Sequence, residues 1–182
     1  MHTLNRNRHH NKRLIEFCLH KAYPDGIITV DKLIDDNLVN GTQVAELAIS
    51  RTAGIPLDLI GIGMDLEDGT DVKTTTVQEN KKKTWIVKDN QKTGKYNISI
   101  SHAAPVKDII NKIGALRVII YNPFTEKNHF LIIPKEVHQK VRLVKVTFCK
   151  TSGNIKGMYS KYEVPTWELL CQPCKFVIQP CV

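Results

Sequence analysis

Long apolar segments are missing from this chain of 182 residues, and no run approaches the roughly 20 residues that a membrane-spanning helix requires. The N-terminus also lacks the apolar core of a secretory signal peptide. We find no internal repeat and no low-complexity tract, and 42% of the residues are hydrophobic, which is ordinary for a globular protein. These features predict a single domain over residues 1–182 that is intracellular, cytoplasmic and without membrane contact.

Acidic residues are scarce relative to basic ones: 18 Asp and Glu stand against 26 Lys and Arg and give a formal charge of +8. An excess of this kind favours a polyanionic partner, because each phosphate that a basic side chain neutralises releases counterions. Nucleic acid is therefore the partner class that the charge favours. Many basic proteins do not bind nucleic acid, so the charge supports this class without selecting it.

Cysteines are few, and their odd number of five in a chain without an export signal argues against a disulfide framework. Cys171 and Cys174 form a C-x-x-C pair, and with Cys149 and Cys181 they would supply four thiolates to a structural zinc ion. The familiar zinc ribbons contain a second such pair, which this chain lacks. We therefore expect ordinary reduced thiols, with zinc as the alternative, and we expect Cys18 in the core.

The acidic residues gather most closely in one short segment, Gly63–Lys73. Residues 67–69 suit a three-residue hairpin loop, because glycine at the third position can take the positive φ that such a loop needs. This register pairs Asp65 with Asp71, and it puts both acids and Lys73 on one face of the hairpin. A two-residue turn would instead put Asp71 on the opposite face. A surface hairpin with solvated charges is the alternative without a site.

Two carboxylates and a lysine on one face have a chemical meaning. Mg²⁺ takes oxygen ligands and keeps several waters, so one pair of carboxylates can hold it. Such a metal polarises a phosphate oxygen and acidifies a water molecule, and a nearby lysine can offset the charge that develops on phosphorus. The segment therefore predicts phosphodiester hydrolysis with Mg²⁺ as cofactor.

The same residues resemble the PD-(D/E)xK signature of type II restriction endonucleases and related DNA-repair nickases. In that family the first acid and the (D/E)xK element lie on adjacent strands, and these places are taken here by Asp65 and by Asp71-Val72-Lys73. The separation of six residues is short for the family and similar to that of the compact mismatch-repair nicking endonuclease. Met64 stands where the family has proline, and Asp58, which follows Pro56-Leu57, is a rival first acid.

The resemblance implies a restriction-endonuclease-like α/β (α+β) fold with a mixed central sheet flanked by helices. It implies a Mg²⁺-dependent, sequence-specific endonuclease that cuts double-stranded DNA as a homodimer. Asp65 and Asp71 would be metal ligands, and Lys73 would position the nucleophile or offset charge in the transition state. Many members add a glutamate from a preceding helix, and Glu46 is the candidate here for that catalytic and metal-binding role.

Three helices are expected in an N-terminal part at about residues 11–53, followed by a sheet-containing catalytic core at about residues 54–148. Glu46 lies at the border of the apolar stripe of the third helix, although a solvated helix glutamate is the commoner case. The helix order also resembles a winged helix-turn-helix with Thr42–Arg51 as recognition helix. A non-catalytic DNA-binding regulator is therefore one alternative function, and a structure-specific repair or junction nuclease is another.

A basic cluster follows the acidic segment. Lysines there would hold phosphates and fix the duplex in register without reading its sequence. The lysines that we assign to DNA are Lys81, Lys82, Lys83 and Lys88. A solvated loop is the alternative interpretation.

Overall fold

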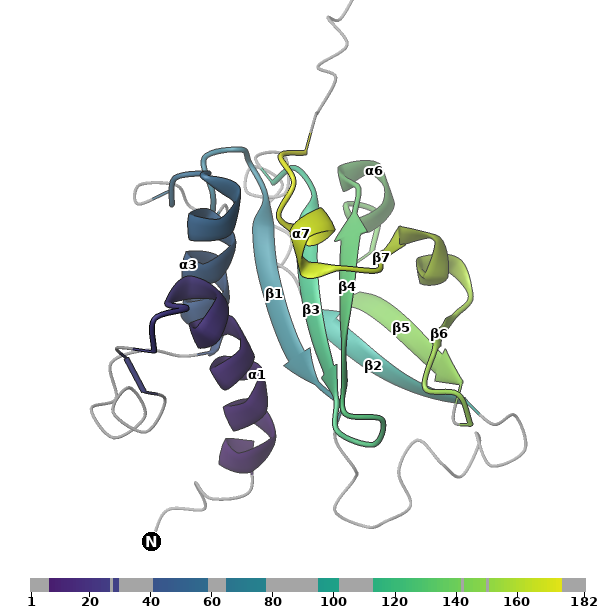
Figure 1. Cartoon of the computed structure of the whole chain (residues 1–182). Coiled ribbons are helices and arrows are strands. Elements are labelled where there is room, and N and C mark those ends of the chain that lie inside the picture. The colour runs from purple at the N-terminus through teal and green to yellow at the C-terminus, as the bar shows by residue number, and fades with distance from the viewer. Residues whose placement is uncertain are drawn as a thin grey trace, which may run out of the picture.

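A pair of helices and two β-sheets form three layers, with the larger sheet in the middle (Figure 1). The computed structural model describes residues 7–26, 28–29, 41–58, 65–77, 95–101, 113–141, 143–149 and 151–174. The helices are α1 (Asn7–Ala22), α3 (Gly41–Ala53), α6 (Lys135–His138), α7 (Trp167–Leu170) and the 3-10 helix η1 (Met158–Tyr162). The strands are β1 (Asp71–Thr76), β2 (Lys95–Ser101), β3 (Leu116–Asn122), β4 (Lys127–Ile133), β5 (Leu143–Cys149), β6 (Ile155–Lys156) and β7 (Glu163–Val164).

The larger sheet has the strand order β1-β3-β4-β7 and mixed strand directions. β1 runs parallel to β3, whereas β4 pairs antiparallel with both β3 and β7. Every residue of β3 is buried, as expected for an apolar strand at the centre of a sheet. Between β1 and β3 the chain leaves this sheet and forms β2 in the second one. Within the described residues β1 pairs with β3 alone, so it forms an edge.

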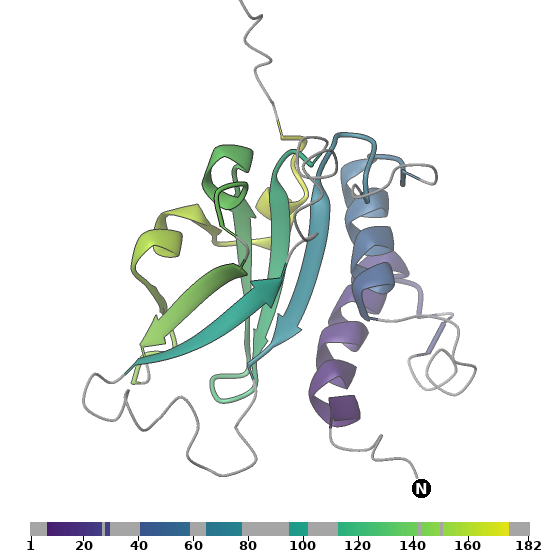
Figure 2. The same cartoon turned by 180° about the vertical axis from the view of Figure 1, so that it is seen from behind.

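The two faces of the larger sheet bury different partners, because successive residues of a strand point to opposite faces. Val72 and Ile119 pack against α1 and α3 in one apolar cluster. Val118 and Ile120 point the other way and pack against Phe148 of the second sheet, whose order is β2-β5-β6. Figure 2 shows this second sheet crossing in front of the larger one.

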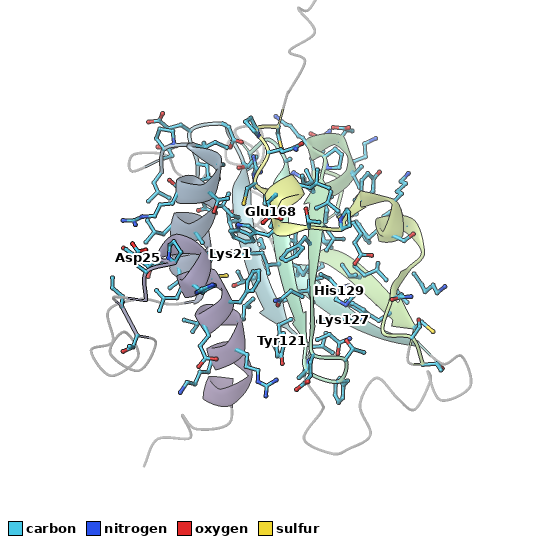
Figure 3. The ribbon with its side chains drawn as sticks, in the orientation of Figure 1. Lys21, Asp25, Tyr121, Lys127, His129 and Glu168 are labelled. Carbon is cyan, nitrogen blue, oxygen red and sulfur yellow. The ribbon has the colours of Figure 1, made fainter. Side chains whose placement is uncertain are left out.

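Helix α7 brings the C-terminal part of the chain back onto the helical layer. The ring of Trp167 lies 5.5 Å from that of Phe17 on α1 and 6.1 Å from that of Phe130 on β4, measured between centroids. Lys21 on α1 points toward Glu168 on α7, and their charged atoms are 3.5 Å apart (Figure 3). Helix α7 therefore closes one side of the core.

The predicted class, helices flanking a mixed sheet, is confirmed at this level, and Cys18 is fully buried as expected. The separate second sheet was not expected. The assigned DNA-contacting lysines lie outside the described residues, as does the second of the three expected helices. None of the described helices is long and apolar enough to cross a membrane.

Gly153, in the turn between β5 and β6, is a position where we expect alanine to be costly. Its φ is 67°, and an added Cβ would overlap the methyl group of Thr125 in the β3–β4 turn. Gly54 after α3 has a φ of 68° but open space around it, so Gly54→Ala measures the backbone cost alone. In urea unfolding, the free energy of unfolding should fall by about 1 kcal/mol for Gly54→Ala. It should fall by about 1–3 kcal/mol more for Gly153→Ala, because the added methyl group also overlaps Thr125. Equal losses would contradict the close contact between the two turns.

Candidate functional site

The predicted three-residue loop is present immediately before β1. Gly69 has a φ of 81°, and its N–H donates to the carbonyl of Leu66 at 2.9 Å. The N–H of Leu66 in turn donates to the carbonyl of Thr70 at 3.3 Å, as expected for a pair of Leu66 with Thr70. The N–H of Asp65 donates to the same carbonyl, so the expected backbone pairing of Asp65 with Asp71 is not formed. No strand ladder extends from these bonds within the described part of the chain, and Leu66 forms an isolated antiparallel bridge with Leu57.

Asp65 stands at the open edge of β1. Its N–H donates to the carbonyl of Thr70 at 3.0 Å, and its carboxylate accepts the N–H of Val72 at 2.6 Å. The neighbouring N–H of Asp71 points the other way and bonds the carbonyl of Ala115 beside β3 at 3.0 Å. The Asp65 side chain thus takes the place that a further strand would occupy next to Val72.

Asp71 begins β1 and is only 2% exposed. One carboxylate oxygen, Oδ1, forms an ion pair with the ammonium of Lys73, which is two residues further along the same strand face. The other oxygen, Oδ2, is buried and has no donor among the described residues. Burial, and then the adjacent Asp65 carboxyl, raise the pKa of Asp71 to about 7 in spite of Lys73.

Glu46 approaches the same place from α3. The hydroxyls of Thr42 on α3 and Thr74 on β1 are 3.1 Å apart, which fixes the first turn of the helix beside the strand. Partial burial is the main cause that raises the pKa of Glu46 to about 7, and the charge of Asp65 adds to it while Lys73 opposes it. Asp65 and Lys73 therefore interact electrostatically with both Glu46 and Asp71, and they link the helix to the strand at this place.

The rival first acid, Asp58, lies across the short bridge from Asp65. Its N–H donates to the carbonyl of Asp65 at 3.0 Å. The carboxyl that raises the pKa of Asp71 is that of Asp65. Asp65 is therefore the better candidate for the first acid of the pair.

The oxygen donors of this cluster suit Mg²⁺. Within the described ranges, no three Asp, Glu, His or Cys side chains are arranged so that they alone would hold a metal ion. Mg²⁺ commonly uses one or two carboxylates and completes its coordination with water and substrate phosphate. A cation would also satisfy the buried Oδ2 atom of Asp71, which otherwise carries a desolvation cost. Asp65 and Asp71 are thus a chemically suitable pair.

The zinc alternative concerns a different part of the molecule. Cys171 and Cys174 follow α7, Cys149 ends β5, and the described residues contain no group of metal-ligating side chains around them. Burial raises the pKa of Cys171 to about 12, so that thiol stays protonated at neutral pH. Cys181 lies outside the described residues.

Sequence reasoning missed one residue at the base of the site. Arg117 lies on β3 with no exposed surface, and its guanidinium contacts Asp68 in the loop that leads to Asp71. The available signal was a lone arginine between Leu116 and Val118 in an otherwise apolar strand. A buried arginine requires partners, so its presence there indicates a polar network.

The chain was compared with known protein families, with curated proteins and with solved structures, and none of them matches.

Proposed function

We propose that this protein is a Mg²⁺-dependent endonuclease that cuts double-stranded DNA at a specific sequence, like the type II restriction enzymes that its acidic segment resembles. The observation that carries the proposal is the convergence of Glu46, Asp65, Asp71 and Lys73 at one edge of a mixed sheet. Acids that can bind a hard cation, together with a lysine beside them, are the groups that phosphodiester hydrolysis needs.

Each residue has a distinct proposed role. Asp65 and Asp71 would hold Mg²⁺, and the chemistry that the ion supplies when bound is polarisation of the phosphate and acidification of a water molecule. Lys73, already paired with Asp71, would lie beside the scissile phosphate and offset its developing charge. Glu46 borders these acids, and partial burial raises its pKa above the ordinary value, so it would serve as the base that orients the attacking water and takes its proton.

The packing of α3 favours a nuclease over a winged-helix regulator. A recognition helix must present side chains to a DNA groove. In this protein α3 buries its apolar stripe against α1 and β1, and Glu46 borders the acidic cluster. Three acids at one point would repel phosphate unless a cation lies between them. The buried residues of the stripe are Val44, Ala45, Ala48 and Ile49.

The proposal extends to fold and assembly. We infer a restriction-endonuclease-like arrangement, because the two acids and the lysine flank one strand of a mixed sheet next to a helix that carries the glutamate. Cutting both strands at a palindromic site calls for two active sites, so the active species would be a homodimer in the cytoplasm. The lysines Lys81, Lys82, Lys83 and Lys88 would hold the DNA backbone.

Plasmid DNA incubated with the purified protein provides the primary test. We expect discrete fragments with Mg²⁺ and intact DNA with EDTA. Cutting confined to mismatched or branched DNA would identify the structure-specific nuclease instead. DNA that is retarded in a gel but uncut with Mg²⁺ would support the regulator and contradict the proposal.

Lys73→Met should reduce the cleavage rate by about 100- to 1,000-fold, the range seen when one charge-stabilising donor is lost. The matched control is Lys127→Met, because Lys127 is an exposed lysine on β4 (Figure 3). It pairs with Asn122 at one end of β3, whereas Asp71 pairs with Leu116 at the other end. Single-turnover cleavage rates measured for both variants test whether Lys73 takes part in cleavage. Similar rates for Lys73→Met and the wild type would remove Lys73 from the mechanism.

A further inference from the structure

Arg117 is the most thoroughly bonded buried charge among the described residues. It is the second residue of β3, beside Val72 of β1, and none of its surface is exposed. A charged group that is taken out of water is tolerated only when hydrogen bonds and an opposite charge replace its hydration. Its partners therefore show what this residue is placed to hold.

The guanidinium joins two segments that are far apart in the sequence. Its Nη2 atom donates to Oδ2 of Asp68 at 2.6 Å, and its Nε atom donates to Oγ1 of Thr70 at 3.2 Å. Its Nη1 atom donates to the carbonyl of Gln172 at 3.0 Å and also to the carbonyl of Leu170. Arg117 thus connects the loop before β1 to the segment after α7.

The loop side of this network closes on itself. The hydroxyl of Thr70 donates to Oδ1 of Asp68 at 2.6 Å, and the N–H of Thr70 donates to the same oxygen at 3.1 Å. Arginine, aspartate and threonine therefore form a ring of bonds. Each member fixes the other two in one arrangement.

Thr70 transmits this arrangement to the acids. Its carbonyl accepts the N–H of Asp65 at 3.0 Å, and the next residue in the chain is Asp71. On the other side of the loop the N–H of Gly114 donates to the carbonyl of Gly69 at 2.6 Å. A shift of Thr70 would therefore move both carboxylates of the proposed metal site.

We infer that Arg117 is the positioning residue of the proposed active site and that it holds Asp65 and Asp71 at their working separation through Thr70. Through its bonds to the carbonyls of Leu170 and Gln172, it also couples that separation to the end of α7. This inference rests on the proposed function for its kinetic consequence only. Arg117 does not touch the acids of the site, so its contribution is geometric. Misplacement of a reacting group by about 1 Å can cost 100-fold in rate.

The test compares Arg117→Met with Asp68→Asn, a milder change that keeps one carbonyl oxygen but removes the charge facing Arg117. The matched control is Arg51→Met, because Arg51 also donates to a backbone carbonyl, that of Ala22, but lies away from the loop. We expect kcat to fall about 10- to 100-fold in Arg117→Met and Asp68→Asn, with KM for DNA nearly unchanged. Arg51→Met should retain the wild-type kcat.

Hydrogen exchange gives a readout that does not depend on cleavage. The amides of residues 65–72 should exchange faster in Arg117→Met and Asp68→Asn, and at the wild-type rate in Arg51→Met. Wild-type kcat in a folded Asp68→Asn protein, or unchanged exchange over residues 65–72, would overturn the inference. If the wild-type protein cuts no DNA, the proposed function fails, while the exchange rates still decide whether Arg117 holds the loop.

Discussion

Asp71→Asn is expected to leave the protein folded and more heat-stable at about pH 8, yet unable to cut DNA. Cleavage should fall by about 1,000-fold or more, because several kcal/mol of charge stabilisation in the transition state depend on the metal that this carboxylate would hold. Stability should rise because the side chain is only 2% exposed and carries a buried oxygen without a donor in the described structure. An amide of the same shape carries no charge to desolvate.

The pH dependence of the expected gain in stability follows from the pKa of Asp71. Burial, with the adjacent Asp65 carboxyl, raises that pKa from 3.8 to about 7, so between these values the folded protein binds more protons than the unfolded chain. The free energy of unfolding therefore decreases as pH rises through this interval and levels off above it. Asparagine does not titrate, so the advantage of Asp71→Asn should be small at about pH 4 and largest at about pH 8.

Thermal unfolding in EDTA at several pH values tests this prediction. Each kcal/mol should shift the melting temperature by about 2–4 °C in a chain of this size. Millimolar Mg²⁺ should raise the melting temperature of the wild type at about pH 8 and have little effect on the variant, since a ligand stabilises only the state that binds it. Asp25→Asn is the matched control, because Asp25 is exposed in the turn beyond α1 (Figure 3). A variant that cuts DNA normally would refute the assignment of Asp71.

Trp167→Ala should cause the largest loss of stability. The side chain is 3% exposed, packs on Phe17 and Phe130, and donates its indole N–H to Oγ1 of Thr52 at 3.1 Å. Truncation leaves a cavity where α1, α3 and β4 meet, and it removes the hydrogen-bond donor of Thr52. We expect the free energy of unfolding to fall by about 3–5 kcal/mol.

Urea unfolding followed by far-UV circular dichroism measures this loss. Phe124→Ala removes an aromatic ring that is 58% exposed, so its cost should stay within about 0.5 kcal/mol. Trp167→Phe keeps most of the buried volume, so its loss of unfolding free energy should lie between those of Trp167→Ala and Phe124→Ala. A loss for Trp167→Ala no larger than that for Phe124→Ala would mean that α7 does not close the core in solution.

Local sequence rules predicted the loop and the side-chain directions around the acids. Glycine at position 69 specified a loop with positive φ, and the alternation along β1 put Asp71 and Lys73 on one face. The apolar residues of α3 face the core, and Glu46 at their border interacts electrostatically with Asp65. These features depend on residues that are near one another in the chain, where spacing is informative.

The pairing of distant strands could not be predicted in the same way. β2 and β5 pair along their full lengths, from Lys95↔Cys149 to Ser101↔Leu143, although they are separated in the chain by β3 and β4. Alternation specifies which face of a strand is buried, but not which strand lies beside it. The second sheet and the network around Arg117 both depend on such long-range contacts.

The bond between Asp65 and Val72 also affects how copies of this chain meet one another. A sheet edge with unpaired N–H groups is a template to which a strand from another molecule can add, and ordered aggregates grow in this way. Here the carboxylate already accepts the outward N–H of Val72 at 2.6 Å and presents negative charge to any approaching backbone carbonyl. The acid proposed for metal binding therefore also blocks edge-to-edge pairing at the Val72 position of β1.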